Sequence, residues 1–188
     1  MVGGSALLLG LIGLILYLVL RGYKHLIKET IEISSETVTI NDMETPSFVY
    51  DTSKRGYRNN NPLNIVQSDA NKWKGEVLPS QDKRFCTFKT MAYGFRAALV
   101  CIRTYITKRN CKTLQEVINR WAPWKDGNNP VNYAQHICNT WPELFTDSDV
   151  AIDPTSKEQM TKLIYAMAIV ENGKAPDMSD CEQGFDLM

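Results

Sequence analysis

The alternation of apolar and polar positions divides the chain into an apolar beginning, a polar stretch and a longer segment with helical and turn patterns. Residues 1–20 carry no charged side chain. At about 1.5 Å of rise per residue, a helix of this length reaches about 30 Å, the hydrocarbon thickness of a bilayer. Basic residues begin only at Arg21, after the apolar stretch, which favours a retained single-pass anchor over a cleaved secretory signal. We therefore expect a transmembrane anchor through residues 4–20, within a segment 1–28 that includes its basic flank.

The polar stretch after the anchor is rich in β-branched residues and predicts a linker over residues 29–52, with room for a short strand. The pattern then becomes typical of a folded domain, which we place at residues 53–175. We expect residues 176–188 to form a C-terminal tail.

Four segments of the domain have the apolar spacing of helices with one buried face. The first begins at Thr90, and the second begins at Thr113, where the sequence TLQE matches a capping box. The third begins at Asn129 and the fourth at Asp153, each followed by a proline suited to the first helical turn. The fourth helix should end at Glu171, before an Asn-Gly pair.

A small hairpin completes the predicted fold. Two short β-like pieces, at residues 73–75 and 84–88, flank a turn-rich stretch that contains proline, serine and aspartate. The fold class is therefore mostly α, an α+β domain of four helices and one hairpin.

The charge balance limits the classes of partner. The chain has 21 basic and 21 acidic side chains, so its formal net charge is zero. Binding to phosphate backbones usually needs a concentrated basic excess, so we expect no nucleic-acid partner. A neutral or polymeric substrate fits this balance better.

The cysteines and histidines offer no metal site. The five cysteines are scattered and odd in number, without a CxxC pair, and the two histidines lie far apart in the sequence. We expect mostly buried free thiols in a protein made in a reducing compartment, and no bound metal.

The most polar motif of the domain is the asparagine loop, residues 55–65 (RGYRNNNPLNI). Asparagine and proline specify turns, and asparagine side chains bond nearby backbone, so this stretch predicts an ordered loop. Its amides and guanidinium groups suit a ligand rich in hydroxyl and acetamido groups, although a purely structural turn is the alternative. The candidate binding residues are Arg58, Asn59, Asn60, Asn61 and Asn64.

Glu171 is the candidate catalytic residue. The apolar stripe of the last helix continues by four positions from Met167 to Glu171, which places this carboxyl on the buried side. Burial and the negative end of the helix dipole both favour the neutral carboxyl that a general acid requires. The alternative is a terminal glutamate that bends out to solvent or bonds a loop amide.

Other acids are weaker candidates for catalysis. Asp82 and Glu76 flank the predicted hairpin, where a second acid could orient water or simply form a turn. Asp126 is expected to be solvated. Asp82 is kept as a candidate substrate-binding residue.

Tryptophans could stack on the apolar faces of sugar rings. Trp73 and Trp124 lie in loop contexts and are the candidates for binding, whereas Trp121 and Trp141 lie on helical stripes and are expected in the core.

The order of several motifs carries a family resemblance. The motifs are the asparagine loop at 55–65, WKG at 73–75, Asp82 with Phe85 and Phe88, YGFRA at 93–97, and RWAP at 120–123 followed by Asn128 and Tyr133. This order resembles phage virion proteins with a lysozyme-like, peptidoglycan-degrading domain, including structural proteins of tailless, membrane-containing phages. The resemblance covers about residues 55–173. It implies a lysozyme-like fold that cuts between N-acetylmuramic acid and N-acetylglucosamine without metal or organic cofactor, and it adds Tyr133 to the binding residues.

One departure from this pattern suggests a rearranged chain order. In lytic transglycosylases and flagellar glucosaminidases the catalytic glutamate ends a helix that precedes the asparagine-rich loop, whereas here the residues before the loop have no helical pattern. The sequence AMAIVENG at 166–173 looks like that catalytic helix. We hypothesise a circularly permuted domain in which Glu171 lies within about 10 Å of the asparagine loop, the reach of a shared glycan site.

The resemblance implies a membrane-anchored, virion-associated enzyme, either a lytic transglycosylase or a lysozyme, that acts when a phage enters or leaves its host. Its expected partners are the peptidoglycan glycan strand, a bilayer contacted through residues 4–20, and other virion proteins. Its expected location is the virion membrane, or the host inner membrane during assembly. The alternatives are a non-catalytic virion structural or glycan-binding protein with the same fold, and a cellular wall-remodelling enzyme.

Overall fold

Helix α3, Met91–Lys108, is the longest helix in the part of the chain that the computed structural model describes, residues 48–188. Its buried residues include Phe95, Ala98, Leu99 and Ile102, whose spacing gives the helix one apolar face. The predicted anchor and most of the predicted linker lie outside the described residues. Within 48–188, no helix combines the length and the apolar character needed to cross a membrane.

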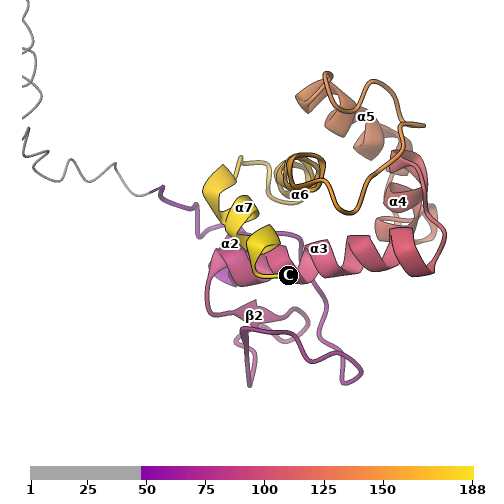
Figure 1. The fold of residues 1–188 in the computed structure, drawn as a ribbon. Coiled ribbons are helices and arrows are strands. Elements are labelled where there is room, and N and C mark those ends of the chain that lie inside the picture. The colour runs from indigo at the N-terminus through magenta and orange to yellow at the C-terminus, as the bar shows by residue number, and fades with distance from the viewer. Residues whose placement is uncertain (1–47) are drawn as a thin grey trace, which may run out of the picture. The chain divides into compact units, whose positions relative to one another are not determined.

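Helix α6, Lys157–Asn172, lies among the other helices (Figure 1). Figure 1 shows it end-on, with α3, α5 and α7 around it. Its residues Met160, Leu163, Ile164 and Met167 are fully buried, which matches the apolar stripe predicted from the sequence. The core of the domain therefore forms where α6 meets its neighbours.

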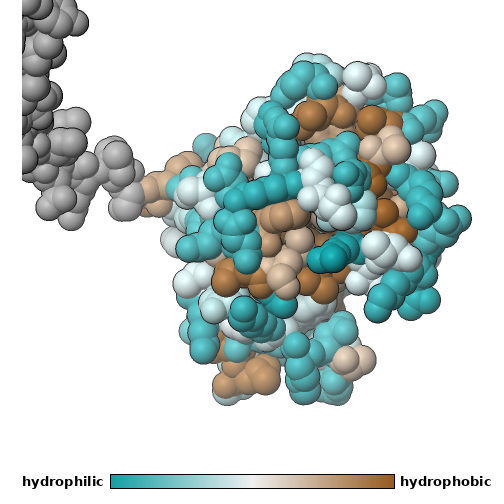
Figure 2. Space-filling model, in the orientation of Figure 1, coloured by the Kyte–Doolittle hydropathy of each residue, from teal (hydrophilic) through white to brown (hydrophobic). Residues whose placement is uncertain are grey.

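The remaining long helices enclose this core. Helix α5, Pro130–Thr140, packs against α6, and α4, Leu114–Trp121, packs against both α3 and α5. Two shorter elements border the site described below: α2, Arg55–Arg58, and the 3-10 helix η1, Trp124–Asp126. Figure 2 shows polar and apolar residues interspersed on the face of the domain in view.

The predicted hairpin is confirmed as a small antiparallel sheet. Strand β1, Glu76–Val77, pairs with β2, Thr87–Phe88, so that Glu76 lies opposite Phe88. The first strand begins after Gly75, a residue with φ +79°, and so lies later than the predicted 73–75. Strand β2 packs on α3, on the other side of that helix from α6 (Figure 1). The prediction of a mostly helical domain with a small sheet is therefore confirmed.

Three of the four predicted helix starts are confirmed. Thr90, Thr113 and Asn129 are the N-cap residues of α3, α4 and α5, and at Thr113 the capping box forms with Glu116. The fourth prediction is wrong by a few residues, because α6 begins at Lys157.

The side chains around the start of α6 explain this difference. The Asp153 carboxylate accepts hydrogen bonds from the backbone N–H and hydroxyl of Thr155 and so closes a turn. Ser156 acts as the N-cap instead, since its hydroxyl accepts a hydrogen bond from the Gln159 N–H. At the other end, Gly173 with φ +67° terminates the helix one residue after Glu171.

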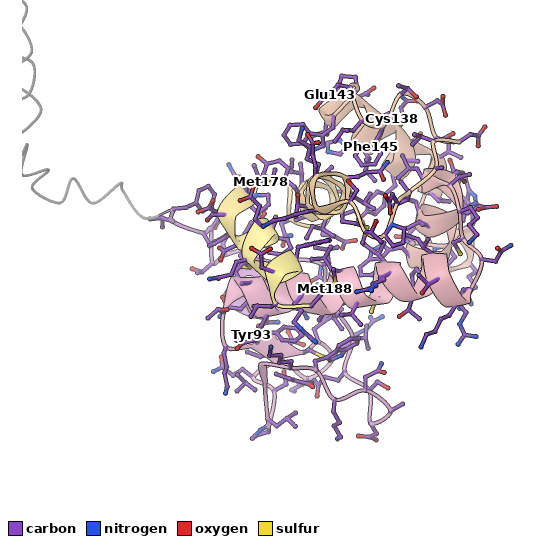
Figure 3. All side chains as sticks on the ribbon, in the orientation of Figure 1. Tyr93, Cys138, Glu143, Phe145, Met178 and Met188 are labelled. Atoms are coloured by element: carbon purple, nitrogen blue, oxygen red, sulfur yellow. The ribbon has the colours of Figure 1, made fainter. Side chains whose placement is uncertain are left out.

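The predicted tail is a helix. Within residues 176–188, α7, Met178–Asp186, packs against both α3 and α6 and buries Cys181 and Gly184. The Arg96 Nε donates a hydrogen bond to the Leu187 carbonyl at 2.9 Å, and Figure 3 shows Met188 beside α3. Met178, Cys181 and Phe185 lie on one face of this helix and pack against the core, a helical spacing that the sequence contains and that the prediction of a tail did not use.

Helix α7 also holds the beginning of the described chain. The Tyr50 hydroxyl donates to Asp180 Oδ2 at 2.7 Å and accepts from the Asp177 N–H at 3.1 Å. Burial, followed by the hydrogen bond to Asp180, raises the pKa of Tyr50 well above its ordinary value. The Tyr57 hydroxyl donates to the Lys174 carbonyl nearby. The two ends of the domain are thus joined by neutral tyrosine hydroxyl groups.

The close packing of α7 on α3 generates a prediction about stability. A side chain at Gly184 would start 2.8 Å from Phe95 Cβ and 3.0 Å from the Ala92 carbonyl oxygen. Gly184→Leu should therefore separate the two helices and lower the free energy of unfolding by about 1–3 kcal/mol. Chemical denaturation of the full-length chain measures this change. Gln183→Ala, at the exposed neighbouring position, is the control, and equal unfolding midpoints for both variants would contradict this packing.

Candidate active site

Glu171 lies in the last turn of α6, half-buried, with hydrogen-bond donors on both carboxylate oxygens. Asn64 Nδ2 lies 3.1 Å from Oε2. The Tyr133 hydroxyl lies 3.1 Å from Oε1, and the Trp121 indole Nε1 lies 3.3 Å from the same oxygen. The carboxyl thus meets a residue of the asparagine loop although 107 positions separate the two in the chain. The proximity required by the permutation hypothesis is present.

The helix end and the asparagine loop are joined by a second contact. Asn172 is buried, and its Nδ2 donates to the Pro62 carbonyl at 2.7 Å and to the Ala168 carbonyl at 2.9 Å. Because Asn172 follows Glu171 directly, this bond fixes the backbone that carries the carboxyl. The loop and the end of α6 are therefore joined through two adjacent residues, Glu171 and Asn172.

Two glycines allow the loop to approach its neighbours this closely. A Cβ on Gly56 would lie 2.3 Å from Asn172 Oδ1, and a Cβ on Gly94 in α3 would lie 2.1 Å from the Asn60 carbonyl oxygen. Neither distance is compatible with a side chain. The glycines of the RGYR and YGFRA motifs are therefore needed to bring α2, α3, α6 and the loop into contact.

The conformation of the loop depends on its own asparagine side chains. Asn61 is fully buried; its Nδ2 donates to the carbonyls of Ile65 and Cys86, both at 2.9 Å, and its Oδ1 accepts from the Ile65 N–H at 2.8 Å. Asn60 and Asn64 have φ +49° and +51°, a left-handed conformation that asparagine tolerates. Asn60 Nδ2 donates to the Phe88 carbonyl at 3.1 Å.

Asn59 and Asp82 bond each other within the structure. Asn59 Nδ2 donates to Asp82 Oδ2 at 3.1 Å, and the other carboxylate oxygen of Asp82 accepts the backbone N–H groups of Arg84 and Phe85. These backbone bonds, and then the Asn59 amide, lower the pKa of Asp82 to about 2. Arg58 points elsewhere and donates to the Thr52 carbonyl at 3.3 Å.

Two pockets meet at Glu171. The larger has a volume of about 680 Å³ and is lined by Asn64, Trp73 and Trp121 among others; the smaller, of about 400 Å³, is lined by Tyr133 and other residues. Glu171 and Asn128 line both pockets. The carboxyl therefore sits where a long ligand could pass from one pocket into the other.

The predicted binding residues divide into two groups. Asn64, Trp73 and Tyr133 line the two pockets around Glu171. The remaining predicted residues line neither pocket. Those in the asparagine loop and the hairpin form hydrogen bonds with other protein groups. Trp124 in η1 is 60% exposed to solvent. The second group consists of Arg58, Asn59, Asn60, Asn61, Asp82 and Trp124.

Several residues of the site were not predicted from the sequence. Trp121, expected in the core, ends α4 and directs its indole N–H to Glu171. Its place in the RWAP motif is the signal that could have identified it. Asp126, expected to be solvated, is exposed but lines the larger pocket, together with Asn71.

Burial sets the protonation state of the tyrosine at the site. Burial first, and the charge of Glu171 second, raise the pKa of Tyr133 well above its ordinary value. Its hydroxyl therefore stays protonated and can donate either to Glu171 or to the Met167 carbonyl, 3.3 Å away. Within residues 48–188, no three His, Cys, Asp or Glu side chains gather closely enough to hold a metal ion.

Comparison with known proteins places the chain among phage proteins. No family model matches it. Protein P5 of Pseudoalteromonas phage PM2 is 36% identical over 138 residues, which are 70% of this chain and 80% of the phage protein. The predicted resemblance to phage proteins is confirmed by this match, which names no activity.

The bonds of Asn61 generate a prediction that separates structural from ligand-binding asparagines. Asn61→Ala removes the hydrogen bonds that the buried Asn61 amide makes to the Ile65 N–H and to the Cys86 and Ile65 carbonyls. The Ile65 carbonyl keeps its bond from the Cys86 N–H, but the Ile65 N–H loses its partner, so the free energy of unfolding should fall by about 2 kcal/mol. Arg58→Ala, at an exposed position of the same motif, should change it by less than about 0.5 kcal/mol. Denaturant titration of both variants provides the measurement, and an undiminished stability of the Asn61 variant would contradict this role.

Proposed function

Since the chain belongs to the family of protein P5 of Pseudoalteromonas phage PM2, we propose that it is a virion-associated enzyme that cleaves peptidoglycan glycan strands. The proposed bond lies between N-acetylmuramic acid and N-acetylglucosamine, and the proposed fold is a circularly permuted lysozyme-like domain. The observation that supports this proposal most directly is the contact between Glu171 and Asn64. This contact brings together a half-buried carboxyl and an asparagine-rich loop. The resemblance to lysozyme-like phage proteins implies a site built from these two parts.

In the proposed mechanism Glu171 acts first as an acid and then as a base. The protonated carboxyl gives its proton to the glycosidic oxygen while the bond from that oxygen to the anomeric carbon of the muramyl sugar breaks. The resulting carboxylate then takes a proton from the nucleophile that attacks the anomeric carbon. In a transglycosylase this nucleophile is the 6-hydroxyl of the same muramyl sugar, and in a lysozyme it is water.

Asn64 suits both protonation states of this carboxyl. Its Nδ2 donates to Glu171 Oε2 at 3.1 Å, whereas its Oδ1 is buried and has no hydrogen-bond partner among the described residues. A 180° rotation of the Asn64 side-chain amide would exchange the positions of Nδ2 and Oδ1. Oδ1 could then accept a hydrogen bond from the protonated Glu171 carboxyl. Asn64 would thus orient Glu171 both before and after proton transfer.

The pockets on both sides of Glu171 suit a polymeric substrate. A glycan strand continues on either side of the bond that is cut, and Glu171 lines both pockets. Trp73 offers an aromatic side chain in the larger pocket, where a sugar ring could stack. Asp126 supplies a second carboxylate in that pocket, which favours hydrolysis if it activates a water molecule.

The proposed setting is a membrane. The apolar residues 4–20 would anchor the chain in the virion membrane, or in the host inner membrane during assembly, so that the domain acts on the wall when the phage enters or leaves the cell. Other virion proteins are the proposed neighbours in the particle.

The role of Glu171 is tested by removing its acidity. Glu171→Gln keeps the size of the side chain but cannot transfer a proton, so clearing of peptidoglycan should fall about a hundredfold or more. Glu158→Gln, an exposed glutamate at the start of the same helix, is the control and should clear like the wild type. A zymogram and a turbidity assay on purified sacculi measure the rates.

The products distinguish the forms of this proposal. Mass spectrometry of the released fragments should show 1,6-anhydro ends for a transglycosylase and reducing ends for a lysozyme. Equal clearing by the wild type and the Glu171 variant would remove Glu171 from the mechanism. Absence of clearing by the wild type would instead favour a structural or glycan-binding protein.

Asn64 allows a second test with an unusually close control. Asn64→Gly removes the amide but tolerates the left-handed backbone, and Asn110→Gly makes the same change at an exposed site with φ +57°. The Asn64 variant should lose about tenfold in rate, the equivalent of one hydrogen bond to a charged group, with a changed pH profile. The Asn110 variant should keep both the rate and the profile. Identical behaviour of the two variants would contradict the role of the Asn64 amide.

A further inference from the structure

Two arginine side chains lie against the ring of Phe85. The Arg55 guanidinium carbon lies 4.7 Å from the centre of the ring and that of Arg84 lies 5.3 Å from it. Phe85 is buried, whereas both arginines are exposed. Among residues 48–188, neither guanidinium has a carboxylate within 4.0 Å or donates a side-chain hydrogen bond. Cation–π contact holds these cations in place and leaves their donors available.

The acidic residue beside them is already engaged. Asp82 uses both carboxylate oxygens to accept hydrogen bonds from Asn59 and from the backbone of Arg84 and Phe85. The positive charge of Arg55 contributes to the low pKa of Asp82, so these two charges partly balance each other. Arg84 remains the cation without a described acidic partner.

The loop that carries Arg84 is fixed before any ligand binds. Gln67 Nε2 donates to the Asp82 carbonyl at 2.7 Å and to the Phe85 carbonyl at 3.2 Å. The Ser80 hydroxyl donates to the same Phe85 carbonyl at 2.7 Å. A preorganised loop loses little conformational freedom when it binds a ligand.

Arg84 also belongs to the larger pocket. It lines this pocket with Trp73, Asn71 and Glu171, so an anion bound by Arg84 would belong to the same ligand that reaches Glu171. The carboxyl groups of the pocket, those of Asp126 and Glu171, offer an anion no positive partner. Arg84 is thus the position in the pocket that suits a negative group, and its planar donors match a carboxylate.

We propose that Arg84 binds a carboxylate of the peptide carried by the muramyl sugars, and that the preferred substrate is therefore peptide-bearing, anionic peptidoglycan. The inference rests on the proposed function, because the peptide carboxylates are anionic groups that accompany the otherwise uncharged sugar rings of such a strand. Arg55 shares the ring of Phe85 with Arg84 but does not line the pocket.

The test compares sacculi that differ only in charge. The amines of one preparation are acetylated, and half of it is then treated with carbodiimide and excess ethanolamine, which converts carboxylates to neutral amides. Cleavage is measured with the wild-type protein. Binding is measured by co-sedimentation in the Glu171→Gln background, where the strand stays intact.

The wild type should bind and cleave the anionic sacculi roughly three- to tenfold better than the neutral ones, the range of a well-oriented arginine–carboxylate pair. Arg84→Gln should remove this preference. Lys83→Gln deletes the same charge at the exposed neighbouring position, which does not line the pocket, and should retain it. Arg84→Lys should retain part of the preference, because it keeps the charge and loses the fork of donors.

The outcomes separate this inference from the proposed function. Equal binding and cleavage of both preparations by the wild type would overturn the role of Arg84 while leaving the lytic function intact. A preference that survives in Arg84→Gln would overturn it as well. The wild type could also prefer anionic sacculi in co-sedimentation, in a manner that depends on Arg84, and yet cleave neither preparation. That result would support the role of Arg84 and refute the proposed enzymatic activity.

Discussion

The site depends on one long-range contact, in which the end of α6 meets a loop more than one hundred positions earlier in the chain. Two adjacent residues make it: Asn172 bonds the Pro62 carbonyl, and Glu171 meets the Asn64 amide. The contact is possible because Gly56 leaves room for the Asn172 side chain, while Gly94 lets α3 approach the same loop. A change that moves either segment by the size of one methyl group therefore affects the placement of the carboxyl, even when it lies outside both pockets.

Regular patterns in the sequence predict the helices well, because helix ends and apolar faces are local properties. The capping box at Thr113 and the stripe that ends at Glu171 are examples. Helix α7 has only a short apolar stripe, Met178, Cys181 and Phe185, within a polar segment, and it is stabilised by packing against α3 and α6. The start of α6 was missed because Asp153 and Ser156 are both suitable caps, and the turn that Asp153 closes with Thr155 leaves Ser156 as the N-cap.

The roles of the asparagines could not be predicted from residue type. An amide that binds a ligand and an amide that bonds its own backbone look alike in a sequence. In the structure Asn61 is enclosed by the loop, whereas Asn64, three positions later, reaches the carboxyl. Trp121 presents the same difficulty, because a tryptophan on an apolar stripe can pack by its ring and still direct its N–H to a functional group.

The hydroxyl of Tyr50 has a mechanical consequence. It joins the first described residues to α7 through Asp180 and Asp177, on the same helix that packs along α3. A pulling force applied through the residues before Phe48 would reach this tyrosine before it reaches the asparagine loop. The hydrogen bonds of Tyr50 would then transfer this force to α7. The loop that contacts Glu171 would bear correspondingly less of it.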